Sequence, residues 1–313
     1  MTKHRLSHRW AELPPAAGTA VMATGIISVG LSLTGHPVLS AVLLAPAAGL
    51  WLLLAVDFSR RLLRDRARWI AEAGTPPAIT AVAATCVLGT RLALLDRYVL
   101  AASLLVVAAL AWPGLLLADV RHWRRRMPGA VFLVCVATEG LAVLAGTLAP
   151  AYGTWLVRAG FALFCLGVLL YPVALHHFAL RQVVTGGGDQ WVAGGAPAIF
   201  ALAGSKLLTS PVWTGGAHTA LRAATLVLLA LAFAWYLVLA AAELARPRPH
   251  YDIRRWSTVF PLGMVAVASL SSASATGIHQ LATAGRALLW IAALVWLLTA
   301  AGLLRQIRRG ADG

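Results

Sequence analysis

The sequence has few charged residues, and acidic residues are scarce among them. Only 12% of the 313 residues are Asp, Glu, Lys or Arg, whereas 60% are hydrophobic. Soluble domains carry about 25% charged residues, and a globule of this size could not bury so much apolar surface while dissolving on so few charges. The composition therefore excludes an ordinary cytosolic enzyme, a disordered protein and a disulfide-stapled secreted domain. It predicts an integral membrane protein.

Catalytic and metal-binding motifs are also absent from the sequence. Cys86, Cys135 and Cys165 lie singly in apolar runs, as small buried hydrophobic residues do. There is no GxSxG elbow, HExxH pair, acidic cluster for magnesium or Walker loop. We therefore expect no enzyme activity, no cofactor and no bound metal.

Long apolar runs fill nearly the whole chain. A helix needs about 20 mainly apolar residues to cross a bilayer, and the sequence predicts an all-α integral membrane protein with ten such transmembrane helices. The predicted spans are 14–34, 38–58, 76–95, 98–118, 128–149, 153–178, 191–210, 219–243, 256–278 and 285–305. They form one domain at 13–306, with tails at 1–12 and 307–313. The first run exceeds the apolar stretch of about 7–15 residues in a signal peptide, so we expect it to be retained.

The basic residues alternate with the spans. The chain has 26 Lys and Arg residues but only 11 Asp and Glu. All but six of the basic residues fall in the two tails and in the loops after every second span. The positive-inside rule places this side, and both termini, in the cytoplasm. Short clusters between spans favour anionic lipid headgroups over nucleic acid as their counter-charge. We therefore expect a multi-pass protein of the plasma membrane that binds no nucleic acid.

Five similar hairpins repeat along the chain. A proline lies near the cytoplasmic start of each odd-numbered span, at Pro15, Pro77, Pro128, Pro197 and Pro261. Small residues follow each proline, whereas the even-numbered spans are richer in Leu, Val and Trp. Small residues suit close packing or a lumen, and bulky apolar residues suit lipid. The pattern predicts five inner helices within five outer ones, and leaves open whether the inner helices enclose a pore or pack solidly.

Two segments carry a more specific pattern, LPPAAGTAVMATGIISVGL in helix 1 and RRWSTVFPLGMVAVAS in helix 9. Together with VATEGLAVLAG and WVAGGAPAIFALAG in helices 5 and 7, they resemble the tellurite-resistance/C4-dicarboxylate transporter family. That family includes the slow-type anion channels of plant guard cells and the malate and sulfite permeases. The resemblance runs from about Leu13 to about Leu304. It implies five repeated hairpins around a central pore, and protomers that associate as a homotrimer.

The resemblance assigns a pore gate to an aromatic residue on helix 9, which is Phe260 here. An apolar ring in a narrow lumen strips water from a passing ion, and this dewetting is costly. The alternative is a phenylalanine that packs helix 9 against a neighbour. The pore-lining candidates lie in the matching segments of helices 1 and 9, and are Gly18, Thr19, Met22, Gly263 and Ser269.

Three ionisable residues inside the predicted spans are functional candidates, because a charge within a membrane is costly. Glu139 and Lys206 fall at similar depths of helices 5 and 7, so one hypothesis is a structural ion pair. In a second hypothesis, Glu139 is protonated and deprotonated during proton-coupled transport. In a third, Lys206 extends to the outer interface and Glu139 stays neutral. Lys206 and Arg91 would attract anions near the outer mouth.

These observations predict transport of small anions through a pore lined by the odd-numbered helices and gated by Phe260. The expected cargo is a C4-dicarboxylate, tellurite or sulfite, or a monovalent anion, and a shared fold does not choose among them. The alternatives are a proton-coupled dicarboxylate carrier and a non-conducting membrane scaffold.

Overall fold

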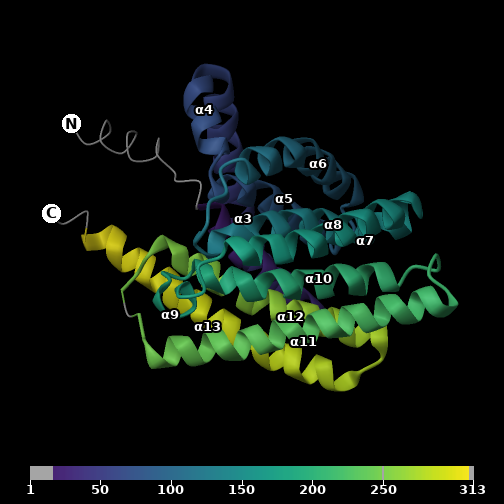
Figure 1. The fold of residues 1–313 in the computed structure, drawn as a ribbon. Helices are drawn as coiled ribbons and strands as arrows, with labels where there is room; N and C mark the ends of the chain where they lie inside the picture. Colours follow the sequence, from purple (N-terminus) through teal and green to yellow (C-terminus); the bar gives the residue numbers. More distant parts are fainter. Residues whose placement is uncertain (1–16, 249, 310–313) are drawn as a thin grey trace.

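Helices make up the regular structure of residues 17–248 and 250–309, which are the residues that this computed structural model describes (Figure 1). A single isolated bridge, between Met127 and Phe178, joins two loops in this part of the chain. The predicted all-α fold is confirmed. The predicted tail at 1–12, residues 310–313 of the other tail, and Pro15 lie outside the described residues.

Ten helices correspond to the ten predicted spans within the described residues. The odd-numbered spans become α2 (Gly18–Leu33), α5 (Thr80–Ala93), α7 (Leu133–Tyr152), α10 (Val192–Leu208) and α12 (Trp256–Thr276). The even-numbered spans become α3 (Pro37–Arg64), α6 (Tyr98–Val120), α8 (Trp155–His177), α11 (Gly215–Ala245) and α13 (His279–Arg309). Eight described helices are long and apolar enough to cross a membrane, whereas α2 and α5 are apolar but shorter.

Short elements occupy the loops at the end of the molecule where the arginines gather. They are the helices α4 (Arg66–Ala73) and α9 (Gln182–Thr185) and the 3-10 turns η2 (Pro76–Ile79), η3 (Gly129–Phe132), η4 (Asp189–Trp191) and η5 (Ile253–Arg255). We call this end the arginine-rich end. All five of the helices that match the odd-numbered spans begin there, and they finish at the opposite end.

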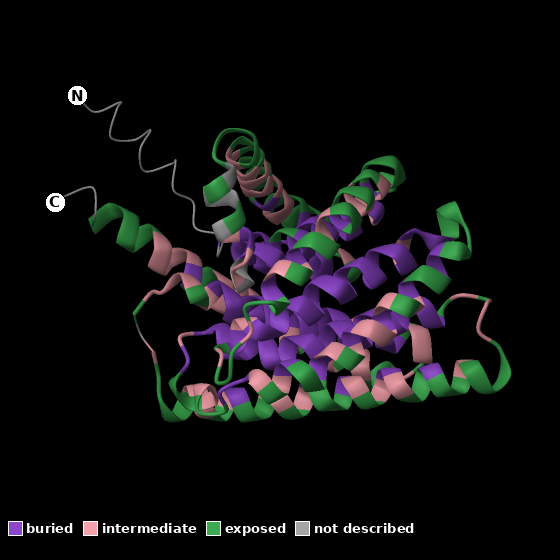
Figure 2. Ribbon diagram, turned by 45° about the horizontal axis from the view of Figure 1, so that its top comes forward, coloured by how far each residue is buried: buried purple, intermediate pink, exposed green. Residues whose placement is uncertain are grey.

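Burial separates two classes of helix. The central stretches of Gly129–Tyr152 and Asp189–Leu208 are each 94% buried, whereas that of α3 is only 11% buried. Figure 2 shows the buried residues gathered in the middle of the molecule, with exposed residues along the helices that surround it. The exposed surface of the outer helices carries many large apolar side chains, such as Leu110, Leu237 and Leu298. Such a surface suits the hydrocarbon region of a bilayer.

The inner helices contact one another in a closed cycle. Each of α2, α5, α7, α10 and α12 packs against the next, and α12 packs against α2. Each inner helix also packs against the outer helix that follows it in the chain, and each outer helix contacts the next inner helix of the cycle. The five hairpins are therefore joined to their neighbours through both members.

Small residues let the inner helices approach closely. A Cβ added to Gly195 of α10 would lie 2.9 Å from Cγ of Pro261 on α12, and one on Gly263 of α12 would lie 2.8 Å from Cγ2 of Ile26 on α2. Comparable contacts join the remaining neighbours, from Gly25 to Val87, from Gly140 to Cys86 and from Gly146 to Lys206. Each of the five inner interfaces thus has a glycine where backbone and side chain meet, which is the packing that membrane helices favour.

Three tryptophans of outer helices are hydrogen bonded to threonines of inner helices. The indole Nε1 of Trp51 donates to Thr85 at 2.9 Å, that of Trp112 to Thr138 at 3.0 Å, and that of Trp296 to Thr24 at 2.9 Å. In each pair, the outer helix reaches the inner helix of the next hairpin rather than its own. The same bond thus recurs at three of the five contacts between an outer helix and the next inner helix.

The prolines themselves occupy two kinds of position. Pro128 precedes η3, whereas Pro197 and Pro261 lie inside α10 and α12. A proline inside a helix leaves the carbonyl four residues earlier without its helical donor. For Pro197 that carbonyl belongs to Ala193, and it accepts a hydrogen bond from the hydroxyl of Tyr171 on α8 at 3.0 Å. An outer helix therefore satisfies the carbonyl that the proline frees.

Candidate functional site

A cavity lies between the inner helices, toward the end opposite the arginine-rich end. Its volume is about 20 Å³, which is room for about one water molecule. All five inner helices contribute to its wall, through Ile26, Val29 and Leu33 of α2, through Cys86, Val87, Thr90 and Leu94 at α5, through Gly140 and Val143 of α7, through Ile199, Leu202 and Lys206 of α10, and through Met264, Val267 and Ser271 of α12. We call it the central cavity.

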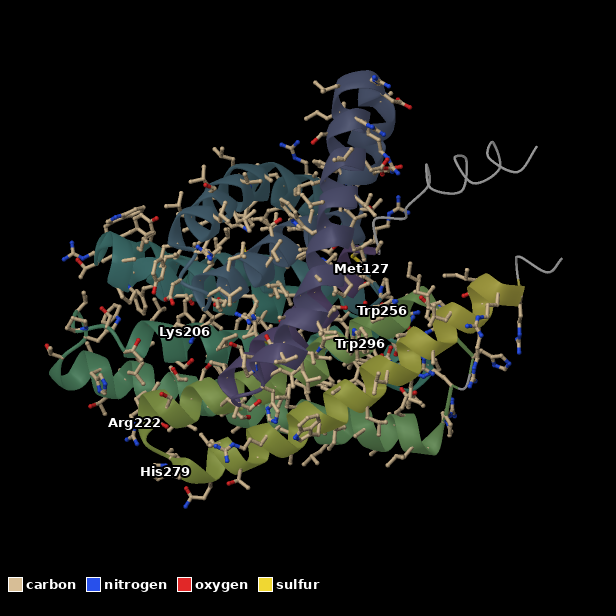
Figure 3. All side chains as sticks on the ribbon, turned by 180° about the vertical axis from the view of Figure 1, so that it is seen from behind. Met127, Lys206, Arg222, Trp256, His279 and Trp296 are labelled. Atoms are coloured by element: carbon tan, nitrogen blue, oxygen red, sulfur yellow. The ribbon has the colours of Figure 1, made fainter. Side chains whose placement is uncertain are left out.

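The wall of the central cavity is apolar with a few polar groups, and Lys206 is its one charged lining residue. Lys206 lies near the end of α10 (Figure 3) and makes no ion pair within the described residues. The hydroxyl groups of Thr90 and Ser271 complete the polar part of the wall. An ammonium ion without a carboxylate makes the cavity electropositive, which favours anions.

The faces that line the cavity can be followed one helical turn further toward the arginine-rich end. Met264, Val267 and Ser271 follow the spacing of one helix face, and the same face continues to Phe260, about 6 Å nearer the arginine-rich end. On the other inner helices, the residues one turn before the lining residues Ile26, Val87, Gly140 and Ile199 are Met22, Ala83, Val136 and Gly195. All five are buried, and the exposed fraction of Phe260 is 1%. We call these five residues the seal.

Two of the pore-lining candidates from the sequence lie at helix interfaces. A Cβ on Gly18 would meet the hydroxyl of Thr80 on α5, and Gly263 faces Ile26. Thr19 and Ser269 are buried, and the Ser269 hydroxyl donates to the carbonyl of Val265 at 2.7 Å. None of these four residues lines the central cavity. Met22 belongs to the seal.

Glu139 and Lys206 are not joined by an ion pair in the described part of the chain. The Glu139 carboxyl is fully buried and lies against α8, where a Cβ on Gly167 would come 2.2 Å from Oε1. Neither of its oxygens has a hydrogen-bond partner among the described residues. Because an unpaired carboxylate in such surroundings is costly, the neutral acid is the form that fits this position.

Arg91 lies behind the wall of the central cavity, where α5 meets α2 and α3. Its exposed fraction is 1%, and its Nε donates to Oγ of Ser40 at 2.8 Å and to Oγ of Ser28 at 3.3 Å. Its Nη1 has no hydrogen-bond partner among the described residues. The neighbouring residue Thr90 lines the cavity, whereas Arg91 does not. Arg91 therefore adds positive charge near the cavity without touching its contents.

Ion pairs hold η5, which leads directly into α12, at the arginine-rich end. Arg255 and Arg248 both pair with Glu243 of α11, the former at 2.7 Å. Asp252 accepts a hydrogen bond from the backbone N–H of Arg254 at 2.9 Å and pairs with its guanidinium at 2.6 Å. These hydrogen bonds lower the pKa of the Asp252 carboxyl below its usual value. The helix that carries Phe260 is thus anchored at its start.

The sequence did not identify most of the residues that line the central cavity. Val87, Thr90, Ile199 and Val267 belong to helices that are buried on every side, so no apolar stripe marks the face that meets the cavity. The spacing of Met264, Val267 and Ser271 shows one face of α12, but it does not say which neighbour that face meets.

Comparisons with known proteins bear on nearly the whole chain. A family model described as a voltage-dependent anion channel matches residues 12–304. A search of curated proteins finds no match. The matched region contains all five inner helices, the central cavity and the seal.

Proposed function

Because the chain belongs to the voltage-dependent anion channel family, we propose that it carries small anions through a pore along the axis of its five inner helices. Anion transport across a membrane is the activity of the family. The observation that supports this path is the central cavity, whose wall takes residues from all five inner helices. A scaffold protein would need no such cavity.

The proposed path has two parts with different tasks. The central cavity admits an anion from the outer side, where Lys206 supplies positive charge without a carboxylate to hold it. Tight binding would block conduction, and a single ammonium in a mainly apolar wall attracts an anion without enclosing it. The seal then closes the path, and Phe260 is its largest side chain. We propose that Phe260 is the gate and that movement of its ring opens the pore.

The placement in the membrane follows from the charge pattern. The arginine-rich end faces the cytoplasm with both termini, the opposite end faces outward, and the protein lies in the plasma membrane. The exposed outer helices contact lipid or the other protomers of a homotrimer. C4-dicarboxylates, tellurite or sulfite, and monovalent anions are the cargo classes that we propose to test.

Flux into liposomes tests this proposal. The purified protein is reconstituted, and the uptake of chloride, nitrate, sulfite and a C4-dicarboxylate is compared with that of potassium. We expect uptake of one or more of these anions above that of protein-free liposomes, and no potassium uptake. Uptake of potassium at the rate of the anions would contradict an anion-selective pore, and no uptake of any ion by the protein or its Phe260 variants would favour a scaffold.

A second candidate function is proton-coupled carriage, and the buried Glu139 carboxyl favours it. Both its oxygens lack partners among the described residues, so a proton is the ligand that this site can accept. If Glu139 carries that proton, anion uptake will increase with an inward proton gradient, and Glu139→Gln will remove the dependence. If anion uptake does not change with the proton gradient in either the wild-type protein or Glu139→Gln, the coupled mechanism is excluded and the channel mechanism remains.

A further inference from the structure

A second, larger pocket opens on the side of the molecule at the arginine-rich end. It has a volume of about 600 Å³ and is lined by α11, α12, α13 and the chain between α11 and α12. Figure 1 shows α11 and α13 along one side of the molecule, with α12 between them. We call it the lateral pocket. It lies outside the ring of inner helices and shares no lining residue with the central cavity.

One part of the lateral pocket is apolar and open toward the surface that the membrane covers. Its wall there includes Leu244 of α11, Leu262 of α12 and Ile291, Val295 and Leu298 of α13. Leu244, Ile291 and Leu298 are exposed. These side chains form a groove between two outer helices, and the hydrocarbon chain of a lipid fits such a wall.

The other part of the lateral pocket carries an excess of positive charge. Arg248, Arg255 and Arg305 line it, with Glu243 as the one carboxylate among the lining residues. Glu243 already pairs with both Arg248 and Arg255. Arg305 is exposed and makes no ion pair within the described residues. The pocket therefore offers an arginine that no residue of its wall neutralises.

A buried hydrogen-bond donor also lacks an acceptor in this pocket. The exposed fraction of Trp191 is 4%, and its indole Nε1 has no hydrogen-bond partner among the described residues. Trp191 lines the lateral pocket and packs edge-on against Tyr236 of α11. A buried donor without an acceptor costs about 1–3 kcal/mol, but the nitrogen itself is covered by protein atoms, so a bound molecule reaches it only if the ring turns.

We propose that the lateral pocket binds one anionic glycerophospholipid. Its phosphate pairs with Arg305 and the neighbouring arginines, and an acyl chain lies in the apolar groove between α11 and α13. The charge selects an anionic headgroup, and the groove selects a lipid over a soluble phosphate.

The position of the pocket gives the lipid a direct contact with the helix of the gate. Thr258 and Leu262 of α12 line the lateral pocket, and they flank Phe260 and Pro261 on the side that faces away from the seal. A bound lipid therefore supports α12 at the level of the seal. This consequence for gating rests on the proposed function, whereas lipid binding does not.

Native mass spectrometry of the protein in detergent tests the binding. The protein is titrated with phosphatidylglycerol and with phosphatidylcholine of the same chain length. We expect one tightly retained phosphatidylglycerol and no comparable retention of phosphatidylcholine. We also expect Arg305→Gln to weaken the retention about five-fold, since one arginine near an anionic headgroup is worth about that factor. Arg308→Gln, an exposed change on the same helix outside the pocket, should leave it unchanged.

A pair of alanine substitutions tests the groove. Ala240 lines the pocket on α11, and the next residue, Ala241, is exposed and does not. Ala240→Phe should abolish retention of the lipid, and Ala241→Phe should not. Excess glycerol phosphate should fail to displace the lipid.

Three results would overturn the proposal. They are equal retention of the two lipids, equal loss in the Arg305 and Arg308 variants, and a change of oligomeric mass in Ala240→Phe without loss of lipid, which would make the pocket an interface between copies. Binding is read without flux, so a non-conducting protein that retains the lipid would contradict the proposed function alone.

Discussion

The same five helices form both the central cavity and the seal, yet the two regions differ in what fills the space between them. In the cavity region, Thr90, Lys206 and Ser271 place polar groups among apolar ones. One turn away, Met22, Val136 and Phe260 are buried and the wall holds no charge. In the proposed path, attraction of the anion and closure of the pore are therefore assigned to different levels of the same helices. A charged wall concentrates an anion, and a short apolar layer is enough to stop it, because an ion must shed its water to pass.

The largest expected effect comes from removing the ring of the seal. Phe260→Ala should raise anion uptake into liposomes by at least about ten-fold, because the loss of the ring leaves space for water at the narrowest level. Phe200→Ala is the matched control. Phe200 is equally buried on α10, but its ring packs against Tyr171 of α8 with centroids 5.7 Å apart. An equal increase in both variants would mean that loosened packing, and not the gate, controls the flux.

Removing the charge of the cavity should have a smaller and opposite effect. In a Phe260→Ala background, Lys206→Gln should lower chloride uptake several-fold at low ionic strength, and the difference should shrink as salt screens the charge. Arg286→Gln, an exposed change on α13, should leave uptake unchanged. If the loss of chloride uptake in Lys206→Gln does not depend on salt, the lysine acts through packing and not through its charge.

The packing of the two regions can be compared through the stability of two glycine variants. At Gly195 in the seal, an added methyl meets the rigid ring of Pro261 at 2.9 Å, whereas at Gly140 beside the cavity it meets Cys86 at 3.1 Å. Overpacking typically costs about 1–3 kcal/mol, and alanine regains about 0.5–1 kcal/mol through helix propensity. Gly195→Ala should therefore lower the unfolding temperature in detergent, and Gly140→Ala should leave it nearly unchanged. The reverse order would show that the seal is loosely packed.

The smallest expected effect is a change in hydrogen exchange at the start of α12 when the pH is lowered. The pKa of Asp252 is lowered in the folded protein, so its contribution to stability is present above the unfolded pKa of about 3.9 and is lost as the pH falls through the lower, folded value. Hydrogen exchange at the first turn of α12 should therefore speed up on acidification to about pH 3. Asp252→Asn should exchange faster already at pH 7, and acidification should change it less. Equal exchange of both proteins at pH 7 would show that Asp252 does not stabilise η5 and the start of α12.

The positions of the helices could be predicted from the sequence, whereas the neighbour that each helix face meets could not. The span 98–118 is found as Tyr98–Val120 and the span 256–278 as Trp256–Thr276, because the thickness of a bilayer sets the length of an apolar run. The contrast between inner and outer helices was also readable, since bulky residues favour lipid. Pro197 and Pro261 lie within the first two turns of α10 and α12, as the predicted spans placed them.

The faces of the inner helices could not be read in the same way. Glu139 and Lys206 lie at similar depths, but Glu139 is directed at Gly167 of an outer helix while Lys206 lines the cavity. Rotation about the helix axis decides this, and a helix that is buried on all sides carries no amphipathic signal of its rotation. The tryptophan–threonine bonds between hairpins, such as Trp112 to Thr138, likewise depend on contacts that only the assembled cycle creates.

Modification of cysteines placed in the central cavity shows whether an anion passes through it, as we propose. In a Phe260→Ala protein whose native cysteines are replaced, Val267→Cys lines the cavity, while position 266 is fully buried and does not line it. A small charged thiol reagent added from outside should modify Val267→Cys rapidly and change anion uptake at once, while Ala266→Cys should not respond. No reaction at position 267, or an equal reaction at position 266, would contradict the account.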